Sequence, residues 1–277
     1  MIIWLASYPK SGNTLLRSIL GAYFFSKDGN FEFDHLYKIG QFPAYRFFDN
    51  LNIDINNEKE IFSNYINAQN LINKNSSTIN FLKTHSALAK LENCNFTDQS
   101  NTLGAIYIVR DPRNVATSFA HHYQIDIDSV VKAMSHVDSN LPKTKLLPTT
   151  FISSWNSNYN SWKALGDRTL IIKYEELTNF KKETLIKVFN FFKNLGMKKK
   201  LDISKLDKII KTTEFKKMQK LEKEKNFTES IFDNKTGKKK TFFNLGPKND
   251  WKKILDDKNT KKIEENFNKE MIELGYL

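Results

Sequence analysis

The start of the chain constrains the fold more than any other segment. Residues 2–7 (IIWLAS) form a short apolar run, and a tight polar loop follows at residues 8–14. After the loop, apolar side chains recur at helical spacing from Leu15 to Tyr23. A buried strand that leads through a tight loop into a helix is typical of α/β proteins, whose parallel sheets are covered by helices on both faces.

The same alternation continues along the chain. Apolar runs at 79–84, 103–109 and 169–174 predict further buried strands. Helices are expected at about 112–121, 150–165, 179–194, 202–211 and 259–274, and a helical, loop-rich stretch at 40–75. We therefore predict a single α/β domain over residues 1–277, with its ligand site at the carboxyl ends of the strands.

The net charge of +12 invites a nucleic-acid interpretation, but its source argues against one. Arginine occurs only at 17, 46, 110, 113 and 168, so lysine supplies nearly all the positive charge. Surfaces that bind nucleic acids are typically rich in arginine or interleave basic and aromatic side chains. The charge favours an anionic ligand, and we predict no nucleic-acid partner.

Cysteine content and hydropathy bear on the compartment. The single cysteine, Cys94, excludes an intramolecular disulfide and fits a reducing environment. The apolar run at 2–7 is too short for the core of a signal peptide or for a membrane span. These features predict a cytoplasmic protein without a membrane span, and they leave its oligomeric state open.

The loop at 8–14 is the first candidate ligand site. Backbone N–H groups in such a turn, together with the following helix N-terminus, bind anions. Lys10 adds a charge, and Ser11, Asn13 and Thr14 add hydrogen-bond donors. Lys10 precedes Gly12, whereas the Walker A pattern places its lysine directly after a glycine. An ordinary N-capped helix after a turn is the alternative.

Two further clusters follow predicted strands. Lys83 and His85 lie at the end of the run 79–84, where a histidine can accept a proton from an alcohol and a lysine can neutralise a phosphate. A strand-end histidine bonded to the backbone is the plainer alternative. Arg110 follows the next strand, and its planar guanidinium suits phosphate, with Ser118 two helical turns further on.

Other groups near these clusters carry weaker signals. Arg113 lies two residues after Asp111, and a local ion pair with Asp111 is the plainer interpretation of its role. The late segments 213–218 (TEFKKM) and 244–252 (NLGPKNDWK) fit either a lid or ordinary loops. Aromatic residues between 42 and 65, with Tyr123, fit either an apolar acceptor pocket or the core, and the core is favoured for most of them.

Together these segments resemble the PAPS-dependent sulfotransferases, the soluble, cytosolic-type family that transfers a sulfuryl group from 3′-phosphoadenosine 5′-phosphosulfate (PAPS) to small alcohols and phenols. The segment SYPKSGNT at 7–14 is similar to the family's TYPKSGTTW loop, and Lys83-Thr84-His85 to its Lys-Thr-His triplet. Later motifs match in the same order at Arg110 with Ser118, LIIKYE at 170–175, Thr213-Glu214-Phe215 and Gly246.

The resemblance implies a fold, a cofactor and a role for each candidate. The fold would be a P-loop-NTPase-like parallel sheet flanked by helices on both faces. His85 would be the general base, and Lys10 and Lys83 would meet the charge on the departing phosphate. The implied cofactor-binding residues are Lys10, Ser11, Gly12, Asn13, Thr14, Arg110, Ser118, Tyr174, Thr213, Phe215 and Gly246.

The same resemblance implies the ligands. PAPS would be the donor, 3′-phosphoadenosine 5′-phosphate (PAP) its product, and a hydroxyl of an alcohol, phenol or sugar the acceptor; no metal is expected. Leu15 stands where the family often has an adenine-stacking Trp, and an Arg-Lys pair before Gly246 is missing, for which Lys240 or Lys248 could substitute. A catalytically impaired PAPS-binding relative and a P-loop kinase-like phosphotransferase are the alternatives.

Overall fold

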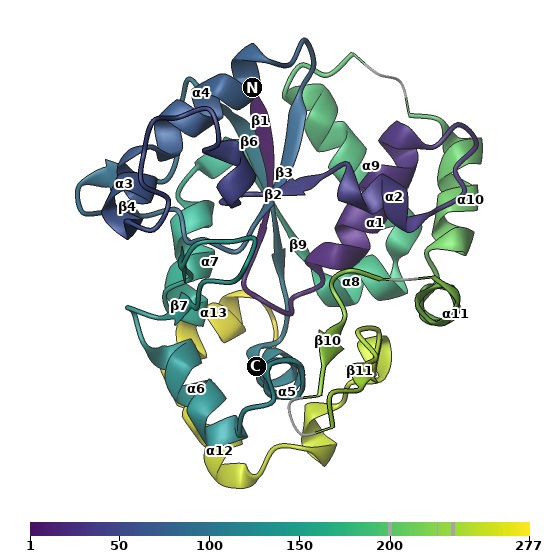
Figure 1. Cartoon of the computed structure of the whole chain (residues 1–277). Helices are drawn as coiled ribbons and strands as arrows, with labels where there is room; N and C mark the ends of the chain where they lie inside the picture. Colours follow the sequence, from purple (N-terminus) through teal and green to yellow (C-terminus); the bar gives the residue numbers. More distant parts are fainter. Residues whose placement is uncertain (199–200, 226, 234–235) are drawn as a thin grey trace.

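A parallel sheet forms the centre of the computed structural model, which describes residues 1–198, 201–225, 227–233 and 236–277 (Figure 1). Five strands lie in the order β2-β3-β1-β6-β9, and each neighbouring pair is parallel. They are β2 Gly40–Gln41, β3 Asn80–Thr84, β1 Ile2–Ser7, β6 Thr102–Val109 and β9 Thr169–Lys173. The predicted α/β fold is confirmed, and the predicted bounds of β1, β3, β6 and β9 agree to within a residue at each end.

Helices cover both faces because alternate side chains of each strand point to opposite sides. Ile2, Trp4 and Ala6 pack into one core, and Ile3 and Leu5 into the other. Helices over the first core are α3 Glu58–Ser63, α4 Tyr65–Lys74, α5 Pro112–Tyr123, α6 Ile127–Ser135, α7 Trp155–Lys163, α12 Asp257–Asn266 and α13 Asn268–Glu273. Those over the second are α1 Asn13–Phe25, α2 Phe33–Tyr37, α8 Tyr174–Asn179, α9 Lys181–Asn194, α10 Ile203–Thr212 and α11 Phe215–Glu224.

The helix prediction at 150–165 is wrong over its first residues. Strand β8 (Thr150–Phe151) pairs antiparallel with β7 (Asn140–Leu141), and α7 begins only at Trp155. The Ser154 side chain fixes that start, since its hydroxyl accepts a hydrogen bond from the Ser157 backbone N–H. Helices α6 and α11 and the short hairpins β4–β5 (Lys90–Leu91, Cys94–Asn95) and β10–β11 (Ile231–Phe232, Lys239–Lys240) were not predicted.

Between residues 40 and 75 most aromatic side chains belong to the core. Phe42, Phe48 and Tyr65 are at most 2% exposed and contact one another and the Trp4 region. The prediction that they are core is confirmed for these three. Across the described ranges, no helix has both the length and the apolar character needed to span a membrane.

Arg113 ties the start of α5 to the C-terminal part of the chain. Its guanidinium donates to both carboxylate oxygens of Asp111, to Glu264 at 2.6 Å and to the carbonyl of Tyr276 at 2.7 Å. The same group lies 4.2 Å from the centre of the Trp251 ring. The predicted local pair with Asp111 exists, and it is one part of a larger buried network that fixes the chain beside Arg110.

Replacing Arg113 with Ala is therefore expected to destabilise the protein strongly. The change leaves Asp111 and Glu264 without their main cation, and breaking a buried pair costs ~3–5 kcal/mol. Urea unfolding measures the loss. Lys163→Ala, which removes an exposed pair with Glu273, is the control and should cost less than ~1 kcal/mol. Equal losses for the two variants would contradict the central role of Arg113.

Candidate active site

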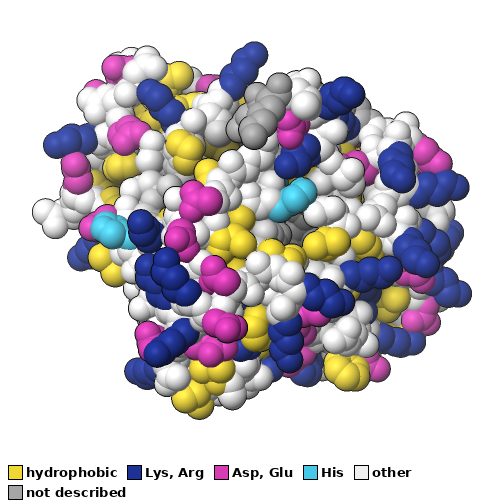
Figure 2. Space-filling model, turned by 90° about the horizontal axis from the view of Figure 1, so that it is seen from below, with side chains coloured by type: hydrophobic (Ala, Val, Ile, Leu, Met, Phe, Trp, Pro, Cys, Tyr) yellow, Lys and Arg dark blue, Asp and Glu magenta, His cyan; other side chains and the backbone are white. Residues whose placement is uncertain are grey.

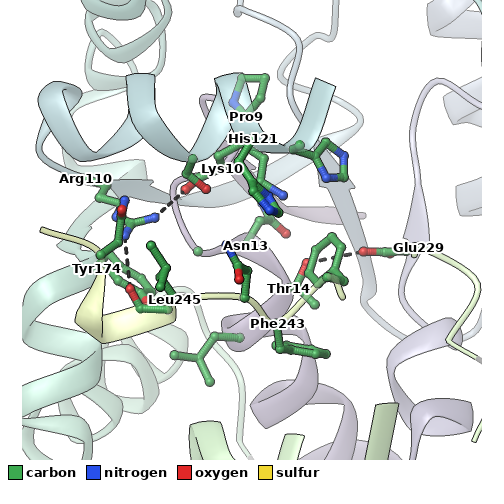
Figure 3. Close-up of a pocket in the computed structure, with 18 of the residues that line it drawn as sticks. Pro9, Lys10, Asn13, Thr14, Arg110, His121, Tyr174, Glu229, Phe243 and Leu245 are labelled. Carbon is green, nitrogen blue, oxygen red and sulfur yellow. Dashed lines mark hydrogen bonds between the residues drawn. The ribbon is translucent and has the colours of Figure 1, made fainter. Parts of the chain in front are cut away.

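A cavity of about 670 Å³ opens at the carboxyl ends of β1, β3 and β6 (Figure 3). Its wall combines the β1–α1 loop, the end of β3, the C-terminal half of α5 and the late segment 241–247. Figure 2 shows a face of the molecule with hydrophobic side chains around a central hollow and with lysine and arginine side chains spread beyond it. All predicted site residues except Ser11 line this cavity; the buried Ser11 hydroxyl has no hydrogen-bond partner among the described residues.

The β1–α1 loop has the backbone shape of an anion-binding turn. Lys10 and Gly12 have positive φ angles of 66° and 105°. A Cβ on Gly12 would lie 2.3 Å from Cδ2 of Tyr174, so glycine is needed for conformation and for space. The Asn13 amide donates to the Leu5 carbonyl at 2.8 Å and to the Ser7 hydroxyl at 3.2 Å, which fastens the loop to β1.

Two lysines line the cavity, Lys10 from the β1–α1 loop and Lys83 from the neighbouring strand β3. Burial, with smaller contributions from Lys83 and Arg110, lowers the pKa of Lys10 to about 7 against the opposing effect of Glu229. Burial likewise lowers the pKa of Lys83 to about 8. The charge of Glu229 opposes this lowering, and the charge of Arg17 adds to it. Both ammonium groups are easier to deprotonate than an exposed lysine, and a bound anion would stabilise their charged forms.

His85 is held by one ring nitrogen. Its Nδ1 lies 2.8 Å from the backbone carbonyl of Ser7, and Asn158 donates to the carbonyl of His85 itself at 3.0 Å. Burial, followed by the charge of Lys83, holds the pKa of His85 well below its ordinary value. The imidazole is therefore neutral at pH 7. The sequence left open whether His85 faces a ligand site or only bonds the backbone. In the structure His85 does both, since it bonds the Ser7 carbonyl and lines the cavity.

Arg110 joins three distant parts of the cavity wall. It donates to the carbonyl of Lys10 at 3.1 Å and to that of Gly246 at 3.3 Å, and it lies 4.4 Å from the centre of the Tyr174 ring. Its buried Nε has no hydrogen-bond partner among the described residues. A buried guanidinium with an unused donor fits an anionic ligand group. Ser118 lies on the same cavity wall.

The late segments form the other end of the cavity. The Phe215 ring packs so closely on Gly246 that a Cβ there would lie 2.1 Å from it, and Gly246 has a φ of 52°. The Thr213 hydroxyl donates to the carbonyl of Ile209 at 2.8 Å, so it stabilises the end of α10. Leu15 also lines the cavity, whereas Lys240 and Lys248 are not among the described residues that do.

Sequence reasoning missed Glu229, which lies beside the two lysines. Its carboxylate accepts from Arg17 at 2.5 Å and from the Thr14 hydroxyl at 3.3 Å. Glu229 lies in no recognisable motif and is separated from Thr14 by more than two hundred residues, so only the folded structure reveals it. Lys181 and His122 were also missed; both line the cavity.

The family is decided by a sequence match that spans nearly the whole chain. A family model described as the sulfotransferase domain matches residues 2–275. The chain belongs to this family. The predicted PAPS-dependent sulfotransferase is thereby confirmed as a class, with PAPS as its cofactor, and the kinase-like alternative loses its support.

Solved structures of sulfotransferases share the fold. Mouse sulfotransferase SULT7A1 complexed with PAP is 20% identical, with a TM-score of 0.61 over 97% of this chain and 83% of that one. Retinol dehydratase in complex with androsterone and PAP is 16% identical, with a TM-score of 0.63 over 98% of this chain and 80% of that one. Retinol dehydratase in a complex with retinol and PAP is 16% identical, with a TM-score of 0.61 over 98% of this chain and 81% of that one. A search of curated protein sequences found no significant match.

Gly12→Ala is expected to destabilise this sulfotransferase more than an alanine at another positive φ. Gly166 has a φ of 59° with nothing within 4 Å of an added Cβ, so Gly166→Ala should cost only the backbone strain, ~1–2 kcal/mol. Gly12→Ala adds a clash with the Tyr174 ring, worth a further ~1–3 kcal/mol. Urea unfolding of both variants measures the difference, and equal costs would show that the close approach is unimportant.

Proposed function

We propose that this sulfotransferase acts on the hydroxyl of an apolar alcohol or phenol, with His85 as the general base. The anchoring of His85 carries the proposal. A carbonyl oxygen can only accept a hydrogen bond, so the 2.8 Å contact with the Ser7 carbonyl favours the tautomer with its proton on Nδ1 over the one in which the Ser7 hydroxyl, at 3.3 Å, donates to that nitrogen. In the neutral ring Nε2 is then the unprotonated nitrogen. A fixed tautomer with a free basic nitrogen is what proton removal from an alcohol requires.

The lysines support the same reaction. PAPS supplies the sulfuryl group, and its departing 5′-phosphate gathers negative charge. Lys10 and Lys83 lie beside His85 in the cavity and can hold that charge, and Thr14 offers a hydroxyl next to them. Preorganised cations in a buried site stabilise developing charge without reorganisation. Ser11, Gly12 and Asn13 would shape the loop that receives the phosphosulfate.

The opposite end of the cavity suits the nucleoside. Arg110 and Ser118 would meet the 3′-phosphate, because the Arg110 guanidinium is buried and keeps an unpaired donor. Tyr174, Thr213, Phe215 and Gly246 would surround the purine. Leu15 supplies an apolar contact in place of an aromatic ring. Arg110 would therefore act without the Arg-Lys pair that the family motif supplies.

The acceptor side of the cavity is mainly apolar. Its described lining there comes from the end of α5, the start of α6 and the β7–β8 hairpin: Tyr123, Ile127, Leu141, Pro142, Leu147 and Thr150. Apolar walls favour a phenol or an apolar alcohol over a sugar, whose hydroxyls would lose their hydrogen bonds with water. The retinol dehydratase structures contain androsterone and retinol, which supports this choice.

We further propose that the chain is a single cytoplasmic domain. Both apolar cores pack on the same central sheet, which supports one folding unit. The one cysteine, Cys94, is a free thiol, which supports a reducing compartment.

Binding and turnover of two variants test the function together. Arg110→Ala should weaken PAP binding at least ~10-fold, the effect of losing a charge-assisted hydrogen bond. His85→Ala should bind PAP as the wild type does, yet lose ~10²–10⁴-fold in turnover with phenol and apolar alcohol acceptors. Isothermal titration calorimetry and sulfate transfer from PAPS, measured in EDTA because no metal requirement is expected, give the two readouts.

The controls separate the alternatives. His136→Ala changes an exposed histidine and should alter neither readout. PAP binding without turnover of any acceptor would support the impaired relative. Preference for ATP with Mg²⁺ would favour a kinase, and salt-dependent binding of duplex DNA would favour a nucleic-acid role. Near-normal turnover by His85→Ala would remove the histidine from the mechanism.

PAP binding should also weaken as the pH rises. The pKa values of Lys10 and Lys83 are about 7 and about 8 in the free enzyme, and a bound anion raises both. The complex therefore keeps protons that the free enzyme loses, so Kd should rise ~10-fold or more between about pH 7 and about pH 9. Titrations across this range measure the slope. Lys83→Gln should reduce the slope, and a flat wild-type profile would contradict the assignment.

A further inference from the structure

Glu229 places a carboxylate inside the cation cluster of the active site. It follows Phe227, whose ring is buried among Phe33, Phe242 and Phe243, so the backbone beside it is well packed. From there the side chain reaches the first turn of α1, as Figure 3 shows for Glu229 and Thr14. The described contacts of its carboxylate are Arg17 at 2.5 Å and the Thr14 hydroxyl at 3.3 Å.

The carboxylate is charged in the free protein. Burial alone would raise the pKa of Glu229, but Lys83, Arg17 and the hydrogen bonds from Arg17 and Thr14 outweigh it and hold the pKa at about 2. Glu229 in turn raises the pKa of Lys10, Lys83 and His85. One negative charge therefore compensates several buried positive ones.

The same groups are those proposed to receive the donor. The Thr14 hydroxyl has one hydrogen, so it cannot donate both to Glu229 and to a phosphosulfate, and the charge of Lys83 attracts either anion. The Glu229 carboxylate and a phosphosulfate are both negative, and two like charges that share these partners in a buried site would repel each other strongly. The Glu229 side chain is 24% exposed, so it borders solvent, toward which the carboxylate would turn on leaving the cluster.

We propose that Glu229 is a resident competitor of the donor: its carboxylate occupies the cation cluster of the free enzyme and leaves when the 5′-phosphosulfate binds. The proposal rests on the proposed function, because it assumes that Thr14 and Lys83 form the phosphosulfate site. Glu229 then lowers donor affinity and keeps the cluster compensated while the site waits for a ligand. Ligands without a 5′-anion gain nothing from its removal.

Glu229→Gln tests this with two nucleotides. The amide keeps the size and a hydrogen-bond acceptor but loses the charge, so PAP should bind ~10-fold to 100-fold more tightly than to the wild type. Adenosine 3′-phosphate, which lacks the 5′-phosphate, should bind both proteins equally. Glu224→Gln makes the same charge change on the exposed face of α11 and should leave both affinities unaltered. Isothermal titration calorimetry gives all the constants.

A second pair of variants avoids an unpaired buried arginine, which could unfold Glu229→Gln. Arg17→Gln and Arg17→Gln/Glu229→Gln both lack that cation, so their difference isolates the carboxylate, and the double variant should bind PAP more tightly. Unchanged or weaker PAP binding on loss of Glu229 would overturn the proposal and assign Glu229 to holding the lysines in place. If the wild type does not bind PAP, the proposed function itself fails.

Discussion

The burial of positive charge at the ends of three adjacent parallel strands governs the rest of this site. Lys10 and Arg110 follow β1 and β6, and Lys83 lies near the carboxyl end of β3 between them in sequence, so sheet topology brings the three together. Desolvating cations costs free energy unless anions or hydrogen bonds compensate them. The fold meets this cost with backbone carbonyls on Arg110 and with the carboxylate of Glu229. A cluster built in this way favours an anionic ligand.

The end of the cavity at the late segment 241–247 depends on one chain of contacts between segments far apart in the sequence. Gly12 lets the Tyr174 ring approach the loop, Tyr174 supports the Arg110 guanidinium, and Arg110 holds the carbonyl of Gly246. Phe215 closes the chain by packing on Gly246. Each member fixes the next, so the loop, the strand ends and the late segment take up their positions together. Arg113 stabilises the following part of the late segment, because its guanidinium stacks on the Trp251 ring.

Much of the fold could be predicted because its signals are local. Continuous apolar runs mark β1, β3, β6 and β9, since strands buried on both faces carry no polar alternation. Helix α11 was missed because its polar, lysine-rich sequence has only Met218 and Glu222 buried. The role of Glu229 could not be predicted, because it arises from a tertiary contact with Arg17. Asn13 was expected to supply a donor to a ligand; it does line the cavity, and that its amide also fastens the loop to β1 is visible only in the folded structure.

The departures from the family motif are consistent with this arrangement. The Arg-Lys pair before Gly246 is missing, and Arg110 is the arginine among the described residues that line the cavity near the late segment. Arg110 bonds two carbonyl oxygens in the free protein, and both are neutral acceptors. A phosphate is a stronger, charged acceptor, and the unpaired Nε of Arg110 offers it a donor while both carbonyl contacts remain. Arg110 thus keeps neutral carbonyl partners and an unused donor in the free protein, whereas the lysines have a carboxylate beside them that already compensates their charge.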